Sequence, residues 1–594
     1  MCGIIGCNGV EGAASAITQG LERLEYRGYD SAGIAIIDNK KIRYEKKKGR
    51  ISVLIKALKT QSDFVGSIGI GHTRWATHGK PSDENAHPHI SGKFAVVHNG
   101  IIENYRQLKE KYLKLVSLKS DTDTEIIVQL LNRLYSGNCL ETLSNTAKLL
   151  EGSFAIAVLC EDEPDTLYCV RKSSPLLIGV GNGVYAASDL SAINDRIHTL
   201  YRMNDGEIAV ISKTEAEFYT FDKKKIVKNP EEFEKAESNC GKENYEHYML
   251  KEIYEQPAAV QKTVDAYLEN NKFRLDFELN KPERIYIVAC GSAYHAGLAG
   301  KRIFEELLKI PVIVQVASEF RYSNPLINEN TPTIIISQSG ETADSLAALR
   351  EAKSRGAKTL SIVNVRHSSI AAESDYVLLT RAGQETAVAT TKAYSAQLAA
   401  LYMLGIYFAE KFGTADSKTT EKLKSQLETL HTAILSALDC EMQIKELAQQ
   451  LQSAEHIYFI GRGLGYAAAC EGSLKLKEIS YIHCEAYAAG EMKHGTISLI
   501  EKGTNVIAAD TEPKLSPKLQ SNIDEVVARG ARVTAITSQG KIKADSVIKT
   551  PAVNELFAVS TQIVPLQLLS YHIARLRGCD IDKPRNLAKS VTVE

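Results

Sequence analysis

The chain has 594 residues, and its 71 Lys and Arg residues balance 72 Asp and Glu residues to a formal net charge of −1 at pH 7. Hydrophobic residues make up 44% of the chain, a share typical of soluble proteins with several domains of ordinary size. This charge balance excludes an electrostatic reason to expect nucleic acid or an anionic membrane as a partner.

The start of the chain lacks the basic flank and long apolar core of a signal peptide. No uninterrupted apolar stretch approaches the roughly 20 residues that a membrane span needs. We therefore expect a cytoplasmic protein that does not enter a membrane.

Cysteine and histidine spacing gives no sign of a metal site. The 11 cysteines lie between Cys2 and Cys579 without a CxxC pair, which favours neither a disulfide framework nor a zinc site. His87-Pro88-His89 suggests a metal, but no second cluster stands at ligand spacing, so we predict none. The glycine loop GRGLG (461–465) does not fit G-x-G-x-x-G, which argues against a nicotinamide cofactor.

Residues 3–213 contain short β-like runs, among them GIIGC, SAGIAIID, KFAVVHNG and SFAIAVLC. Helical stretches such as TDTEIIVQLLNRLY stand between them. This spacing predicts two sheets with covering helices.

Cys2 stands directly behind the initiator Met1. The small side chain at position 2 allows removal of Met1, and a thiol and a free α-amine would then share one residue. The amine, with a reference pKa of about 7.7–8.0, can serve as the base of a nucleophilic cysteine.

Partners for such a nucleophile on an amino-acid substrate are present in the same part of the chain. Arg74 can clamp a carboxylate, Asp123 can hold an ammonium group, and Asn99-Gly100 can form an oxyanion hole. Taken singly, the patterns favour other structures: a surface charge for Arg74, a helix cap for Asp123 and a hairpin turn for Asn99-Gly100.

A charged segment, FDKKKIVKNPEEFEKAESNCGKENYEH, is the natural linker, and the chain after it reads as α/β. That second part repeats itself in order with offsets of 170 to 174 residues. The matched positions are Ile285 with Ile457, Arg355 with Arg529 and Gln397 with Gln567. Two copies of one domain with a parallel sheet are therefore expected, with ligands at the carboxyl ends of the strands.

The first copy carries SQSGET (337–342) after a buried strand, and the second has DTEPKL in its place. Hydroxyls, a glycine and a helix start suit a phosphate site, but a plain turn with a Ser/Thr cap fits equally well. The loss of this loop from the second copy predicts different tasks for the two copies.

In the second copy, Glu471, Lys475 and Glu478 fall on one helical face. This spacing is usual for a solvated salt-bridge face, but a cluster of acids, lysines and histidine among small residues is also what proton transfer on a sugar requires. The adjoining segment adds Glu485, Glu491, Lys493 and His494.

Together these motifs resemble a known family. CGIIGC, LEYRGYDSAG, GHTRWATHG, HPH, VHNGIIEN and SDTDTE are similar to the class II glutamine amidotransferase domain. CGSAYHAG, SQSGETADS, EGSLKLKEISYIHCEAYAAGEMKHG and DKPRNLAKSVTVE are similar to the paired sugar isomerase domains of glutamine–fructose-6-phosphate aminotransferases (isomerizing). The resemblance implies an α+β N-terminal-nucleophile hydrolase domain (αββα) followed by two α/β sugar isomerase domains with parallel sheets.

The resemblance also implies the domain boundaries. They are a glutamine amidotransferase domain over 2–218, a linker and connecting helix over 219–277, sugar isomerase domains over 278–417 and 448–584, and a catalytic tail over 585–594.

In the first part, the resemblance makes Cys2 the nucleophile and Asn99 and Gly100 the oxyanion hole. The implied glutamine-binding residues are Arg74, His87, Gly100 and Asp123, and the implied ammonia gate is Trp75.

In the second part, the implied sugar-phosphate residues are Ser337, Gln338, Ser339, Thr342, Val388 and Thr390. Lys475 and Glu478 would act around C1–C2, His494 of a neighbouring subunit would open the ring, and Lys589 would form a Schiff base. Such a lysine must be neutral to attack, so we expect desolvation or nearby positive charge to lower its pKa.

Two departures from the family pattern are visible. CGTSY is replaced by a sequence ending in Ala293-Tyr294, which removes one expected hydroxyl from the sugar site. Thr496 replaces the proline that usually follows KHG.

The implied activity converts fructose 6-phosphate and glutamine to glucosamine 6-phosphate and glutamate, at the entry to hexosamine biosynthesis. The expected enzyme is a cytoplasmic homodimer without metal or organic cofactor. Two alternatives stay open: an amidotransferase for another acceptor, and a non-catalytic sensor of sugar phosphates.

Overall fold

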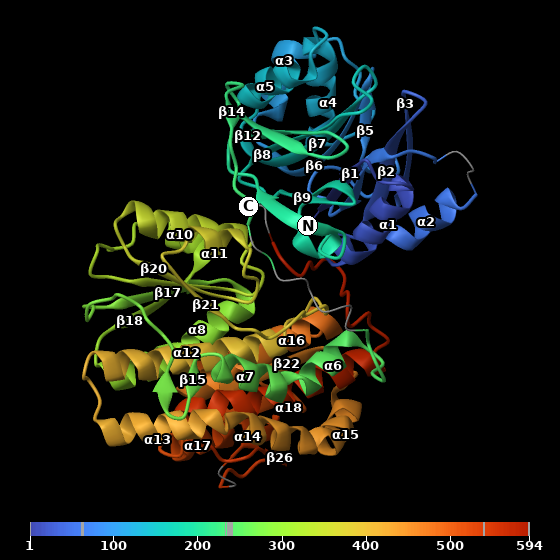
Figure 1. Ribbon diagram of the computed structural model, residues 1–594. Coiled ribbons are helices and arrows are strands. Elements are labelled where there is room, and N and C mark those ends of the chain that lie inside the picture. The colour runs from blue at the N-terminus through green and yellow to red at the C-terminus, as the bar shows by residue number, and fades with distance from the viewer. Residues whose placement is uncertain (1, 61–63, 232, 234–240, 539–540, 592–594) are drawn as a thin grey trace. The chain divides into compact units, whose positions relative to one another are not determined.

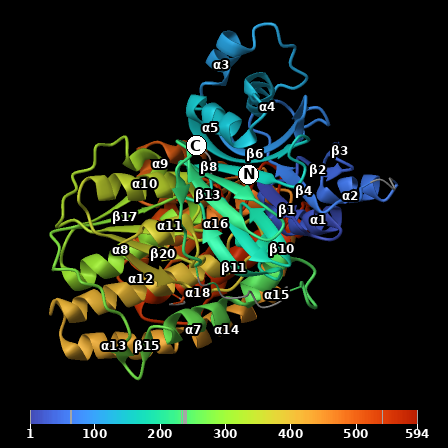
Figure 2. The ribbon, with the colours of Figure 1, turned by 45° about the horizontal axis from the view of Figure 1, so that its top comes forward.

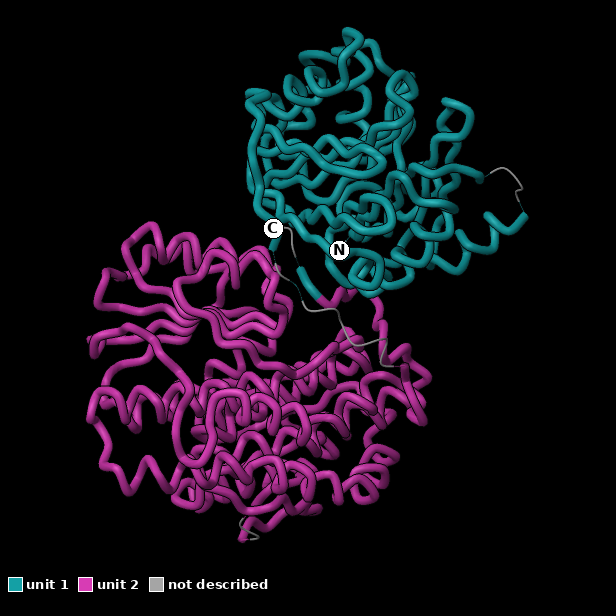
Figure 3. Tube along the Cα trace, viewed as in Figure 1, with its two compact units in different colours: residues 1–239, 590–594 teal, residues 240–589 magenta. Residues whose placement is uncertain are grey.

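A computed structural model describes residues 2–60, 64–231, 233, 241–538 and 541–591 (Figure 1). The chain forms two compact units, residues 1–239 with 590–594 and residues 240–589 (Figure 3). Each unit has its own hydrophobic core.

The first unit is built on two seven-stranded antiparallel sheets. The first sheet has the order β11-β9-β10-β1-β4-β2-β3, with β1 (Gly3–Asn8), β2 (Ser31–Asp38), β3 (Lys41–Lys48), β4 (Ile68–Arg74), β9 (Leu177–Gly181), β10 (Gly183–Ala187) and β11 (Ile197–Arg202). The second has the order β14-β13-β12-β8-β7-β6-β5, with β5 (His89–Ser91), β6 (Phe94–Ile102), β7 (Gly152–Cys160), β8 (Leu167–Lys172), β12 (Glu207–Ile211), β13 (Ala216–Thr220) and β14 (Lys225–Ile226).

Buried residues run almost without interruption along the central strands, such as β1 and β4, because both faces of each sheet are covered. One core lies between the sheets and includes Ile4 and Val97. The outer faces are covered by helices (Figure 2): α1 (Ala13–Leu24) and α2 (Ile51–Leu58) on the first sheet, α3 (Tyr105–Tyr112), α4 (Asp123–Leu134) and α5 (Cys139–Leu149) on the second. This αββα order confirms the predicted architecture.

The second unit contains two five-stranded parallel sheets of the same strand order, β18-β17-β19-β20-β21 and β23-β22-β24-β25-β26. The first has β17 (Ile285–Ala289), β18 (Val312–Val316), β19 (Thr333–Ser337), β20 (Thr359–Val363) and β21 (Tyr376–Leu379). The second has β22 (His456–Gly461), β23 (His483–Ala488), β24 (Asn505–Asp510), β25 (Arg532–Thr537) and β26 (Ser546–Lys549). The shared topology confirms the predicted duplication.

Helices cover both faces of each parallel sheet. Around the first sheet, α10 (Ala343–Ser354) and α11 (Ser369–Glu373) lie on one face, and α8 (Gly291–Leu308) and α12 (Lys392–Lys411) on the other (Figure 1). The second copy has α16 (Leu464–Ser480), α17 (Ser516–Val527) and α18 (Ala558–Leu576). The other helices of the unit are α6 (Tyr248–Tyr254), α7 (Gln256–Asp265), α9 (Ala317–Phe320), α13 (Ser417–Glu428), α14 (Leu430–Ala437) and α15 (Glu441–Leu451).

The predicted domain boundaries stay a prediction. Within 219–277, β14 pairs with β13 and so extends the second sheet past residue 218, and the short pair β15 (Leu268–Glu269) and β16 (Lys272–Phe273) follows α7.

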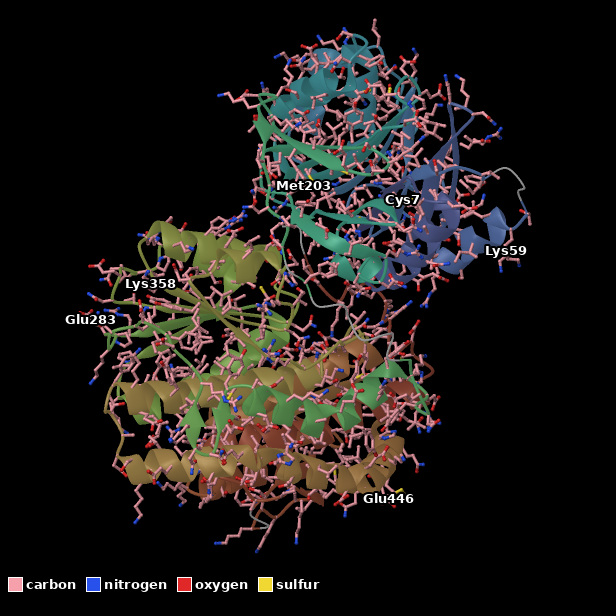
Figure 4. The ribbon with its side chains drawn as sticks, viewed as in Figure 1. Cys7, Lys59, Met203, Glu283, Lys358 and Glu446 are labelled. Atoms are coloured by element: carbon pink, nitrogen blue, oxygen red, sulfur yellow. The ribbon has the colours of Figure 1, made fainter. Side chains whose placement is uncertain are left out.

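Burial separates core side chains from surface side chains in both units (Figure 4). Cys7 and Met203 are fully buried, whereas Glu446 lies exposed at the surface. In the part of the chain that the structure describes, one helical stretch, Glu555–Leu576, is long and apolar enough to cross a membrane. Its most apolar window is completely buried, so it is a core helix of the second unit.

Candidate functional site

The Cys2 thiol lies against the end of β4. The backbone N–H of Trp75 donates to Cys2 Sγ at 3.3 Å, and Gly3 pairs with Thr73 across β1 and β4. Burial raises the pKa of Cys2. The resting thiol is therefore protonated, and a base must take its proton before it can act as a nucleophile.

Asn99 and Gly100 lie inside β6 rather than in a hairpin turn. Asn99 Nδ2 donates to the backbone oxygen of Cys2 at 3.0 Å. Gly100 has φ +129°, and a Cβ there would stand 1.9 Å from the backbone oxygen of Ser153 on β7. Only glycine fits this close approach of two strands.

Arg74 is 3% exposed, so it is not a surface charge. Its Nη2 donates to the backbone oxygens of His78 and Gly79. Its Nη1 is buried and has no partner among the described residues. A buried guanidinium donor without a partner is costly, and this nitrogen is free to donate to an anionic ligand.

Asp123 is the first residue of α4, but it does not cap the helix. The residue before the helix is Thr122, and Asp123 Oδ2 instead accepts from Ile102 N at 2.8 Å. The charges of Arg74 and Asp123 both act on the Cys2 thiol, which places the two groups in its surroundings.

His87 is buried in a group of aromatic rings beside this site. Its ring stacks on His72 at 4.0 Å between centroids and meets His89 at 4.8 Å. His87 Nδ1 accepts from His98 N at 3.3 Å. Burial holds the pKa of His87 well below its usual range, so the ring is neutral.

In the second unit, the SQSGET loop joins β19 to α10. Ser337 Oγ lies 3.0 Å from Thr342 Oγ1 and accepts from Gly340 N at 3.0 Å. Gly340 has φ +66°, and a Cβ would stand 2.0 Å from Ser368 Oγ. Thr342 precedes α10 without a side-chain cap bond, so the plain Ser/Thr cap is not what the structure has. Gln338 and Ser339 complete the loop.

Lys475 and Glu471 lie in the core, and Glu478 is half-buried at its edge, so this is not a solvated face. The side chain of Lys475 is 1% exposed and that of Glu471 is fully buried. Lys475 Nζ pairs with Glu478 and lies 3.7 Å from Glu471 Oε1. Glu471 also accepts from Ser292 and from His295 of α8, both at 2.8 Å, and so joins the two copies. These carboxylates raise the pKa of Lys475.

Lys589 lies buried against Glu385. Glu385 also accepts from Thr390 Oγ1 and, at 2.9 Å, from Thr391 N. Desolvation or a nearby positive charge was expected at Lys589; its side chain is indeed buried, but the neighbour it pairs with is a carboxylate. Glu385 is thus the ion-pair partner of Lys589.

Asp582 anchors the segment that leads to Lys589. Its carboxylate accepts from Tyr248 N and Met249 N at the start of α6, at 3.0 and 2.9 Å, and its backbone oxygen accepts from Val388 N at 3.0 Å. This hydrogen bond connects Val388, a predicted sugar-binding residue, to the C-terminal segment that carries Lys589.

Other predicted residues lie elsewhere. His494 ends a short 3-10 helix, Glu491–His494, and is exposed. Within the described ranges, no hydrogen bond or ion pair joins it to Lys475, Glu478 or Lys589. Lys493 pairs with Glu525 at the surface, so it does not belong to the Lys475 cluster.

The two departures have local consequences. Ala293 lies in the first turn of α8, where the neighbouring Ser292 hydroxyl binds Glu471. Thr496 opens a second 3-10 helix, Thr496–Leu499, where proline is the usual residue.

Sequence reasoning missed His72, Glu385 and Asp582. His72 stands two residues before Arg74, and its Nε2 lies 3.1 Å from Asn99 Oδ1. Glu385 is an acid among small residues just before the AVATTK stretch, which was the one available signal. Nothing in the tail marks Asp582 out from its charged neighbours.

Comparison with known proteins shows two domain families on this chain. The model of the SIS domain matches residues 278–407 and 450–577, and that of the glutamine amidotransferase domain matches residues 72–195.

Curated relatives match along the whole length. The chain is 50% identical to the glutamine–fructose-6-phosphate aminotransferase [isomerizing] of Caldanaerobacter subterraneus subsp. tengcongensis and 47% identical to that of Clostridium tetani, with 100% of each chain covered. Among solved structures, the C-terminal domain of glucosamine-fructose-6-phosphate aminotransferase from Francisella tularensis is similar, with a TM-score of 0.57 and 39% identity. The match covers 58% of this chain and 100% of the Francisella tularensis chain.

Proposed function

This chain belongs to the glutamine–fructose-6-phosphate aminotransferase (isomerizing) family, and from that premise we propose that it converts D-fructose 6-phosphate and L-glutamine to D-glucosamine 6-phosphate and L-glutamate. The observation that carries the proposal is that both proposed nucleophiles, Cys2 and Lys589, are held by polar contacts within one chain. Cys2 contacts Trp75 and Asn99, and Lys589 pairs with Glu385.

Glutamine hydrolysis belongs to the first unit. The Cys2 thiol, losing its proton to the α-amine that removal of Met1 exposes, adds to the side-chain amide carbon of glutamine. Asn99 Nδ2 and the N–H of Gly100 receive the oxyanion, and Arg74 Nη1 and Asp123 hold the α-carboxylate and α-ammonium groups. Ammonia leaves as the thioester forms, and water then releases glutamate.

The sugar chemistry belongs to the second unit. The loop 337–342 binds the phosphate, since its hydroxyls and backbone N–H groups stand at a helix start. Lys589 adds to the C2 carbonyl and water leaves, which gives a Schiff base that ammonia displaces. Glu478, beside Lys475, moves the proton between C1 and C2 that turns the ketose into an aldose.

Three further roles follow from the family resemblance. Trp75 gates the ammonia that Cys2 releases, and Gln338, Ser339, Val388 and Thr390 complete the sugar site. His494 opens the sugar ring of a neighbouring subunit in a homodimer, and its exposure leaves it accessible to another chain. We place the enzyme in the cytoplasm.

The proposal is tested with glutamine labelled with 15N at the side-chain amide. Purified full-length protein is given this glutamine with fructose 6-phosphate, and the products are analysed by mass spectrometry. We expect labelled glucosamine 6-phosphate, no such product from Cys2→Ala, and no synthesis from Lys589→Arg.

Two results would contradict the proposal. Labelled amino sugar formed only from another ketose phosphate would make the chain an amidotransferase for a different acceptor. Full glutamine-dependent synthesis by Cys2→Ala would remove the assigned nucleophile.

A further inference from the structure

His72 bonds the two sheets of the first unit together beside the nucleophile. It lies on β4 of the first sheet, where it pairs with Ile4 of β1. Its Nε2 reaches to β6 of the second sheet, 3.0 Å from the backbone oxygen of His98 and 3.1 Å from Asn99 Oδ1. Cys2 adjoins the first sheet and Asn99 belongs to the second, so this contact joins the sheet of the nucleophile to the sheet of its amide donor.

The contact also determines which way the Asn99 amide faces. A backbone oxygen only accepts, so the His72 nitrogen that faces His98 O must carry the proton. The same N–H then meets the amide oxygen of Asn99. Nδ2 of Asn99 is then left facing Cys2, and it donates to the backbone oxygen of Cys2 at 3.0 Å.

The surroundings of His72 hold the ring in one state. The side chain is fully buried and packed on the ring of His87. Its Nδ1 is buried without a partner in the described part of the chain, so a proton there would have no acceptor. Burial and the nearby Arg74 charge lower the pKa of His72 to about 3, which keeps the ring neutral.

We propose that His72 is a positioning residue for glutamine hydrolysis: its Nε2–H holds the Asn99 amide with Nδ2 directed to the oxyanion that forms at Cys2. The inference rests on the proposed function, because the oxyanion exists only if Cys2 attacks an amide. Without His72, only the bond from Nδ2 to the backbone oxygen of Cys2 holds the amide, which can then turn its oxygen toward the developing negative charge more easily.

The test is a double-mutant cycle of His72→Ala and Asn99→Ala in the full-length protein. We expect His72→Ala to lower kcat for glutamine hydrolysis by about 10- to 100-fold with little change in KM, a partial loss of one oxyanion donor. In the Asn99→Ala background it should lower kcat by less than about threefold, because its effect passes through Asn99.

His72→Gln keeps an N–H donor, so we expect it to recover most of the lost kcat. An aldehyde analogue of glutamine, which forms a tetrahedral adduct with a thiol, should bind His72→Ala more weakly by the factor lost in kcat. Binding of L-glutamate, which forms no adduct, should stay unchanged. The exposed histidine of β11 provides the matched control, His198→Ala, which should behave as wild type.

Equal losses from His72→Ala in both backgrounds, or wild-type kcat and wild-type aldehyde binding, would overturn the inference. The proposed function fails by a different result, which is glutamine hydrolysis by Cys2→Ala. A melting curve for each variant detects a folding defect as a lowered Tm. Glutamate binding is a second check, since a folding defect would weaken it and a loss of positioning would not.

Discussion

The two terminal nitrogens of Arg74 differ in their hydrogen bonds, and this difference favours a binding role over a purely structural one. Nη2 is satisfied by backbone oxygens, so the side chain is already held, while Nη1 is buried without a partner in the described structure. Burial lowers the pKa of Arg74, although the charges of Asp30 and Asp123 partly offset this effect. A bound carboxylate would relieve both costs.

We therefore expect Arg74→Lys to raise KM for glutamine by about 10- to 100-fold, because lysine lacks the second donor of the guanidinium fork. Initial-rate kinetics of glutamine hydrolysis provide the measurement. The exposed Arg133→Lys is the control. An unchanged KM in Arg74→Lys would show that Nη1 does not bind the substrate.

At the scale of elements, β6 approaches β7 closely at Gly100, which we propose as part of the oxyanion hole. Gly100 leaves no room for a side chain, because a Cβ would overlap the backbone of β7. Gly206 also has a positive φ, of +81°, but a Cβ there would meet nothing within 4 Å.

Gly100→Ala should therefore destabilise the first unit by more than about 2 kcal/mol, and Gly206→Ala by only about 1 kcal/mol. Trp75, the single tryptophan of the chain, allows unfolding of this unit to be followed by fluorescence in urea. Equal losses in the two variants would show that strand contact adds nothing to the cost of a positive φ.

Helix α6 brings a second carboxylate, that of Glu252, close to Glu385. Glu252 is 2% exposed and accepts from Ala387 N at 3.3 Å. Burial and the negative charge of Glu385 raise the pKa of Glu252 to about 8, from an ordinary value of 4.5. Its contribution to stability is therefore full below pH 4.5 and is lost as the pH rises toward 8.

Glu252→Gln cannot ionise, so its Tm relative to wild type should rise as the pH is raised from about 5 to about 9. Calorimetry at matched pH values measures this difference. The surface variant Glu446→Gln should show no such trend. A constant difference for Glu252→Gln across this range would mean that Glu252 is already ionised.

At the scale of the whole molecule, two units with separate cores should respond to separate ligands. A ligand that binds only the folded form of one unit stabilises that unit by about 2.7 kcal/mol at 100 times its Kd. L-glutamate should bind the first unit, and glucosamine 6-phosphate the second.

We expect L-glutamate to raise the temperature of the transition that Trp75 fluorescence reports. Glucosamine 6-phosphate should raise a transition that is visible in calorimetry and not in that fluorescence. One transition moved equally by both ligands would show that the units unfold together.

Much of the whole-molecule architecture was readable from the sequence, because periodicity and repeats are local patterns. The spacing of short β-like runs predicted the two sheets of the first unit, and matches such as Ile285 with Ile457 predicted the duplication. The motifs predicted the family, and the relatives confirm it.

Only the tertiary structure decided which of the alternative interpretations is correct for each polar residue. Arg74 is buried, Asp123 does not cap its helix, and Lys475 lies in the core. Burial depends on what distant segments pack above a side chain, which no local pattern records.

Long-range contacts were equally out of reach of the sequence. Glu385 meets Lys589 across 204 residues, and His72 meets Asn99 across two sheets. The sequence by itself determined which elements form and which family they belong to. The fold decided which side chains meet, because hydrogen bonds between distant segments arise only when the sheets and helices pack.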